Sequence, residues 1–101
     1  SKLVEMSFDR PRFEDFPMLS LAYSAAEKSQ KYTIAYNAAN EVAVASFIKQ
    51  EIGFMDIPKI TGQVLENDWT GEPETFDEIF DADKLARKLA GKYILQIKDK
   101  A

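Results

Sequence analysis

Carboxylates dominate the side chains of this sequence that could do chemistry, and they gather between residues 66 and 83. The run consists of Glu66, Asp68, Glu72, Glu74, Asp77, Glu78, Asp81 and Asp83. Such oxygen ligands could in principle hold Ca²⁺ or Mg²⁺. A helix–loop–helix calcium loop, however, needs a glycine at its sixth position, and counted from Asp81 that position is Ala86. We therefore interpret the run as residues that begin helices, where the helix dipole favours negative charge.

Other kinds of catalysis lack their usual side chains. The sequence has no cysteine and no histidine, which excludes thiol chemistry and removes the commonest metal ligand and general base near neutral pH. The four glycines stand apart from one another, so there is no Gly-rich loop to hold a phosphate. Acid–base work by paired carboxylates would need a cleft and a raised pKa, of which the sequence gives no sign. The residues alone predict no catalytic, cofactor-binding or metal-binding position.

Length and charge limit the class of protein. The chain has 101 residues, enough for one domain with a modest core. Its 13 basic and 17 acidic residues give a formal net charge of −4, so we expect no nucleic-acid partner. No apolar run approaches the roughly 20 residues that span a bilayer, and we expect no membrane segment. The chain begins with Ser1 rather than Met, which suggests a trimmed protein or a piece of a longer one.

The segment over residues 37–50 predicts the central helix of the fold. At about 100° per residue, apolar or small side chains cover nearly every side of it, so we expect other helices to surround it. Asn37 is a natural N-cap, and Glu41 would lie near the positive end of the helix dipole. We expect the helix to end before Gly53, a residue suited to a left-handed turn.

Two shorter helices are predicted on either side of this segment. The first begins at Pro17, where a missing N–H does no harm, and runs to about Lys28. The other begins at Asp56 and ends near Asn67. In the loop that follows, we expect Trp69 to cover one end of the core rather than to bind a ligand.

The last segment predicts two helical pieces. Thr75 and Glu78 are spaced as a capping box, which favours a short helical turn over residues 76–80. A separate helix capped by Asp81 or Asp83 would follow. Its apolar face consists of Ala82, Leu85, Ala86, Leu89, Tyr93 and Ile97, and the basic residues opposite are Lys84, Arg87, Lys88 and Lys92. These basic residues could touch phosphate or an acidic surface, but such a stripe is usually the solvated face of a helix.

Together these segments predict an all-α fold, a small bundle of about four helices over residues 13–101. Residues 1–8 alternate loosely between apolar and polar side chains, and residues 9–12 then turn the chain, so we expect residues 1–12 to form an extended arm. One strand cannot form a sheet alone, so we expect this arm to lie against the helices or to pair with a larger parent protein.

Ile94 and Leu95 are candidates for contacts outside the bundle. Both project toward the otherwise polar side of the last predicted helix, where two large aliphatic side chains would be left in water. We expect them to contact another part of a larger assembly. The alternative is a bend at Gly91 that folds both side chains back onto the bundle.

Asn37, Asn40 and Glu41 form a second candidate group, at the predicted start of the central helix. Their side chains could hydrogen-bond to a neighbouring domain, or they could serve only to cap the helix and to bond within the bundle. The sequence leaves both interpretations open.

Three ordered blocks carry a resemblance to a known family. The blocks run from Phe16 to Tyr23, from Asn37 to Phe47 and from Ile52 to Ile57. In sequence and in separation they closely resemble the C-terminal domain of 1-deoxy-D-xylulose 5-phosphate reductoisomerase. Residues 3–8 look like the linker into that domain, and residues 77–90 resemble its last helix more loosely.

The resemblance implies the all-helical terminal domain of a cytoplasmic bacterial enzyme of the non-mevalonate isoprenoid pathway. That family uses NADPH and a divalent cation, Mg²⁺ or Mn²⁺, to convert 1-deoxy-D-xylulose 5-phosphate to 2-C-methyl-D-erythritol 4-phosphate, usually as a homodimer. Its cofactor, metal and phosphate sites belong to earlier parts of the family's chain, so no residue here inherits such a role. The chain alone is therefore expected to be inactive, with the remaining domains as its partners. The alternative is a free-standing helical interaction module.

Overall fold

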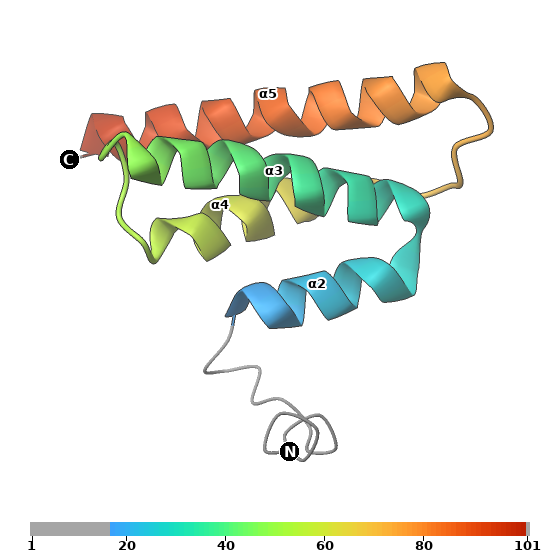
Figure 1. The fold of residues 1–101 in the computed structure, drawn as a ribbon, viewed down its shortest axis with the longest axis horizontal. Helices are drawn as coiled ribbons and strands as arrows, with labels where there is room; N and C mark the ends of the chain where they lie inside the picture. Colours follow the sequence, from blue (N-terminus) through green and yellow to red (C-terminus); the bar gives the residue numbers. More distant parts are fainter. Residues whose placement is uncertain (1–16, 101) are drawn as a thin grey trace, which may run out of the picture.

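Four α-helices make up the part of the chain that the structure, a computed structural model, describes, which is residues 17–100 (Figure 1). They are α2 (Pro17–Lys28), α3 (Gln30–Ile48), α4 (Asp56–Leu65) and α5 (Phe76–Lys100), and these residues contain no strand. The prediction of an all-α bundle is confirmed. The predicted arm over residues 1–12 and the boundary before residue 13 lie outside the described residues. No helix within residues 17–100 combines the length and the hydropathy that crossing a membrane requires.

Helices α3 and α4 form the centre of the bundle. Each of them contacts the other three helices, whereas α2 and α5 lie on opposite sides and do not touch each other (Figure 1). Small side chains let α3 and α5 approach closely. The buried alanines are Ala35, Ala38, Ala39 and Ala43 on α3 and Ala82, Ala86 and Ala90 on α5.

The larger core side chains come from α4 and the loop after it. Ile60 and Val64 are fully buried, and Ile57 is 5% exposed. Trp69 covers one end of this core with 3% exposure, and its indole N–H donates to the carbonyl oxygen of Val64 over 2.8 Å. The predicted structural role of Trp69 is confirmed.

Helix α3 begins well before the predicted start at Asn37. Its N-cap is Ser29, whose backbone is extended and whose hydroxyl oxygen accepts from the N–H of Tyr32. The same hydroxyl donates to the carbonyl oxygen of Trp69 over 2.7 Å, and the N–H of Gln30 donates to the carboxylate of Glu72. Since these partners satisfy the free groups at the helix start, the helix continues through the polar residues that follow. The prediction of an Asn37 cap is therefore wrong.

The end of α3 is closed by Gln50 and not by Gly53. Gln50 has φ 63°, and Gly53 does not adopt a positive φ. The N–H of Glu51 donates to the carbonyl of Ser46 over 3.0 Å, and the N–H of Gln50 donates to that of Phe47 over 2.9 Å. This pair of bonds is a Schellman motif, in which the residue after the cap must be left-handed.

Helix α5 is continuous, which corrects the prediction of two pieces. The capping box at its start is confirmed: the N–H of Glu78 donates to Thr75 Oγ1 over 3.2 Å, and the N–H of Thr75 donates to Glu78 Oε2 over 3.1 Å. Asp81 and Asp83 lie inside the helix and cap nothing, because the box already satisfies the free N–H groups of the first turn.

Candidate functional site

The solvent-exposed side of α3 forms a ridge between two grooves. We call it the α3 ridge, and it consists of the exposed residues Asn37, Glu41, Phe47 and Ile48 and the half-buried residues Asn40 and Val44 at its edge. Ile48 is 72% exposed and Phe47 is 37% exposed. The expectation that helices surround α3 on every side is wrong in this sector, because α2, α4 and α5 cover only the side that carries the alanines.

The first groove, which we call the apolar groove, lies between the first turn of α2, α3 and the connection to α4. It has a volume of about 370 Å³ and is lined by Pro17, Met18, Leu19, Asn40, Val44, Phe54, Met55, Ile57 and Pro58. Phe54 is 66% exposed and Met55 is 62% exposed. The ring of Phe54 meets that of Phe47 edge to face, with centroids 5.6 Å apart. Asn40 is the one polar side chain in this lining.

The amide of Asn40 is half-buried in the wall of the apolar groove. It makes no hydrogen bond to any residue between 17 and 100. An amide offers two N–H donors and a carbonyl acceptor, so its hydrogen-bonding capacity is available to whatever enters the groove.

The second groove, which we call the charged groove, lies between α3 and α5 and also has a volume of about 370 Å³. Arg87 pairs with Glu41 over 3.0 Å and with Asp83 over 2.9 Å. These two carboxylates raise the pKa of the Arg87 guanidinium above its ordinary value. Lys98 pairs with Glu51 over 3.2 Å. The Glu41–Arg87 pair ties α3 to α5, the Lys98–Glu51 pair ties α5 to the connection after α3, and the Asp83–Arg87 pair lies within α5.

Glu51 in the charged groove accepts two side-chain hydrogen bonds. Its Oε1 accepts from the Ser46 hydroxyl over 2.7 Å, and its Oε2 accepts from Lys98. These hydrogen bonds, first that of Ser46 and then that of Lys98, lower the pKa of Glu51 below its ordinary value. The carboxylate is therefore ionised at neutral pH and bonded to both helices.

The structure separates the five residues that the sequence singled out. Glu41, Ile94 and Leu95 line the charged groove, Asn40 lines the apolar groove, and Asn37 lies exposed on the α3 ridge. None of the polar three lies near the helix start, so the dipole argument for Glu41 is wrong. Glu41 instead forms an ion pair with α5.

Ile94 and Leu95 differ from each other. Leu95 is 58% exposed, as expected, but Ile94 is only 6% exposed, so the prediction that it lies in water is wrong. Ile94 falls one turn beyond Ala90 on the buried row of α5, because the helix passes Gly91 without a break. The alternative, a bend that folds both back, is also wrong. Leu85, placed on the apolar face by the sequence, is 48% exposed.

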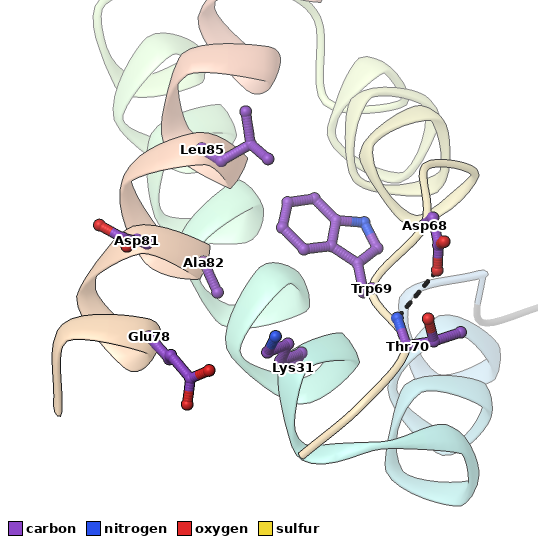
Figure 2. Close-up of a pocket in the computed structure, with 8 residues that line it drawn as sticks. All are labelled: Lys31, Asp68, Trp69, Thr70, Glu78, Asp81, Ala82 and Leu85. Carbon is purple, nitrogen blue, oxygen red and sulfur yellow. Dashed lines mark hydrogen bonds between the residues drawn. The ribbon is translucent and has the colours of Figure 1, made fainter. Parts of the chain in front are cut away.

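A smaller pocket of about 230 Å³ lies where the loop before α5 meets α3 and α5. Figure 2 shows Lys31 between Glu78 and Asp81 on one side and Thr70 of the loop on the other. Hydrogen bonds from the side chain and the N–H of Thr70 lower the pKa of Asp68. The N–H groups of Glu74 and Thr75 lower that of Glu78.

These contacts explain part of the acidic run as a set of backbone caps. Lys31 adds a favourable charge, which lowers the pKa of both Asp68 and Glu78 further. Within residues 17–100, no three carboxylates converge as metal ligands would. The interpretation of these residues as helix-starting carboxylates is supported for Glu78.

The apolar groove is the feature that sequence reasoning missed. Phe54 and Met55 lie in one of the three blocks that carry the family resemblance, but neither was singled out as a candidate for a contact. Two large apolar side chains in a short helix connection have little chance to fold back onto the core, and this signal could have predicted their exposure.

Comparison with known proteins gives consistent results. A family model described as the DXP reductoisomerase C-terminal domain matches residues 1–89. The 1-deoxy-D-xylulose 5-phosphate reductoisomerase of Treponema denticola is 46% identical over 95 residues, which cover 94% of this chain and 25% of the relative. That of Saccharophagus degradans is 48% identical over 88 residues, which cover 87% of this chain and 22% of the relative.

A solved structure agrees with these matches. The reductoisomerase of Zymomonas mobilis, in complex with NADPH, is similar with a TM-score of 0.78 and 35% sequence identity. The match covers 85% of this chain and 23% of that chain. The chain thus spans about a quarter of the length of the relatives that it matches.

Proposed function

Because the chain belongs to the family of DXP reductoisomerase C-terminal domains, we propose that it is the C-terminal support domain of a 1-deoxy-D-xylulose 5-phosphate reductoisomerase. In this proposal the complete enzyme converts 1-deoxy-D-xylulose 5-phosphate to 2-C-methyl-D-erythritol 4-phosphate with NADPH and a divalent cation, Mg²⁺ or Mn²⁺. The observation that carries the proposal is the 46% identity to a reductoisomerase over nearly the whole chain. The NADPH in the similar Zymomonas mobilis structure supports the cofactor.

The role assigned to this domain is mechanical. The described residues do not fit a divalent cation, since no three carboxylates converge and Asp68 and Glu78 accept from backbone N–H groups instead. The glycines likewise form no phosphate-binding loop. We therefore assign the cation and NADPH to the remaining part of the enzyme. The four helices supply a rigid body against which that part can pack.

The wider assembly belongs to the same proposal. The partners of this domain are the remaining domains of its own polypeptide, since the chain spans only about a quarter of its relatives. A homodimeric enzyme in the bacterial cytoplasm follows from the resemblance and stays a prediction.

An NADPH titration of the 101-residue chain tests whether the chemistry lies elsewhere. We expect no saturable binding and no turnover of 1-deoxy-D-xylulose 5-phosphate, because the described residues offer neither a phosphate loop nor a cation site. Fluorescence or calorimetric titration measures the binding. A saturable isotherm with NADPH would contradict the assignment of a support role.

The upstream reading frame distinguishes the reductoisomerase from the competing function, which is a free-standing interaction module. A reductoisomerase requires a nucleotide-binding segment and a carboxylate cluster encoded upstream in the same frame as Ser1. An independent module would lack both of them.

A further inference from the structure

The apolar groove exposes more hydrophobic surface than the fold itself explains. Leu19, Phe54 and Met55 are 36%, 66% and 62% exposed, and they lie on the same groove. Single exposed apolar residues are common, but a contiguous apolar patch on a soluble domain usually marks an interaction site. The groove therefore has the character of an interaction site.

The lining residues indicate which chemical groups could bind in the groove. The walls are apolar and accept an aliphatic or aromatic side chain, of the kind that anchors most interfaces. The amide of Asn40, which makes no hydrogen bond to residues 17–100, can donate and accept at once, which matches a backbone peptide group. A protein segment with an apolar side chain satisfies both features.

The position of the groove indicates where this segment comes from. Pro17 and Met18, the first residues of α2, form part of its wall, so the polypeptide that precedes α2 is covalently joined to the groove. In the relatives, the matching region is 25% or less of the length, so most of the polypeptide lies outside it. A covalently linked partner acts at a high effective concentration, so a small groove is sufficient to hold it.

We infer that the apolar groove is the docking site for the preceding domain of the same polypeptide. An apolar side chain of that domain packs between Met18 and Phe54, and one of its backbone peptide groups hydrogen-bonds to Asn40. This inference rests on the proposed function, because it requires a longer polypeptide.

Single cysteines test the inference cleanly because the chain has none of its own. Met55→Cys places a thiol in the groove, and Phe80→Cys places a control thiol at a similarly exposed position on α5, at 65% against 62%. Maleimide labelling of each site is followed by mass spectrometry of its peptide. This is done in the 101-residue chain and in the full-length protein.

We expect both thiols to react rapidly in the 101-residue chain. In the full-length protein, Met55→Cys should react at least about tenfold more slowly relative to Phe80→Cys, because a docked thiol reacts only during transient opening. An unchanged ratio of the two rates would overturn the inference. Slower labelling of Met55→Cys in the 101-residue chain on addition of NADPH or 1-deoxy-D-xylulose 5-phosphate would also overturn it, by identifying a small molecule as the occupant.

Asn40→Ala tests the polar half of the inference. In the full-length Met55→Cys protein, this substitution should restore part of the labelling rate, whereas the melting temperature of the 101-residue chain should not fall. Full protection in the presence of Asn40→Ala would exclude a docking role for the amide.

Turnover of 1-deoxy-D-xylulose 5-phosphate by the full-length protein is measured in the same samples. An active enzyme with an unprotected Met55→Cys rejects only the docking site. A protected Met55→Cys in a protein with no turnover leaves the docking site standing and rejects the reductoisomerase function.

Discussion

Ser29 joins two parts of the fold through one hydroxyl group. As N-cap, it accepts from the N–H of Tyr32, and it donates to the carbonyl of Trp69 in the loop before α5. The start of α3 and the loop that carries the buried tryptophan are therefore positioned by the same atom. This explains why α3 begins here rather than at Asn37.

Ser29→Ala should lower the free energy of unfolding by about 1–2 kcal/mol, because it removes the cap and the bond to Trp69. Urea unfolding of the 101-residue chain measures the change. Asn37→Ala is the matched control: Asn37 is exposed within α3, and alanine has the higher helix propensity, so no loss is expected. A larger loss at Asn37 than at Ser29 would contradict the observed helix start.

Sequence reasoning at the residue scale succeeded where the partners are close in the chain. The capping box of Thr75 and Glu78 and the buried position of Trp69 were both predicted. The choice between Ser29 and Asn37 could not be made, because it depends on the carbonyl of Trp69 and the carboxylate of Glu72, some 40 residues away in the chain. Partners so far away in the chain cannot be recognised from the spacing of neighbouring residues.

At the scale of elements, the connection from α3 to α4 is determined by the end of α3. The Schellman motif forces Gln50 into a left-handed conformation and turns the chain toward the apolar groove. A residue with a Cβ is strained in this conformation, and glycine is not.

Gln50→Gly should raise the free energy of unfolding by about 1 kcal/mol, because it removes the cost of a left-handed non-glycine residue. Lys49→Gly is the control, since Lys49 has φ −78° and glycine there only adds entropy to the unfolded chain. Denaturant unfolding of both variants measures the difference. A lower stability for Gln50→Gly would show that the left-handed turn does not form in solution.

The faces of α5 were predicted only in part. The predicted apolar face included Ala82 and Ala86, but it also took in Leu85 and left Ala90 and Ile94 out, which placed Ile94 on the polar side. The structure centres the contact on Ala82, Ala86 and Ala90, and Ile94 continues that row. Small residues determine where two helices approach most closely, but hydrophobicity alone gives them little weight.

At the scale of the molecule, the fold class was predictable and the open surface was not. Amphipathic segments separated by turn residues are sufficient to predict an all-α bundle. Which side of α3 stays uncovered depends on how three other helices pack against it, and the apolar groove exists only through that packing. For this reason the sequence left the role of Asn40 open between an interdomain contact and a cap, whereas its observed position is in a groove wall.

The support role is tested most directly in a chimera. The matching region of the Treponema denticola reductoisomerase, which is 46% identical over 95 residues, is replaced by this chain, and oxidation of NADPH is measured with 1-deoxy-D-xylulose 5-phosphate as substrate. We predict that the chimera turns over within about tenfold of the parent enzyme, which corresponds to a loss of roughly 1.4 kcal/mol or less in transition-state stabilisation. Its turnover should also be far above that of the parent enzyme truncated before this region. A chimera that is folded, yet no more active than the truncated enzyme, would contradict the account.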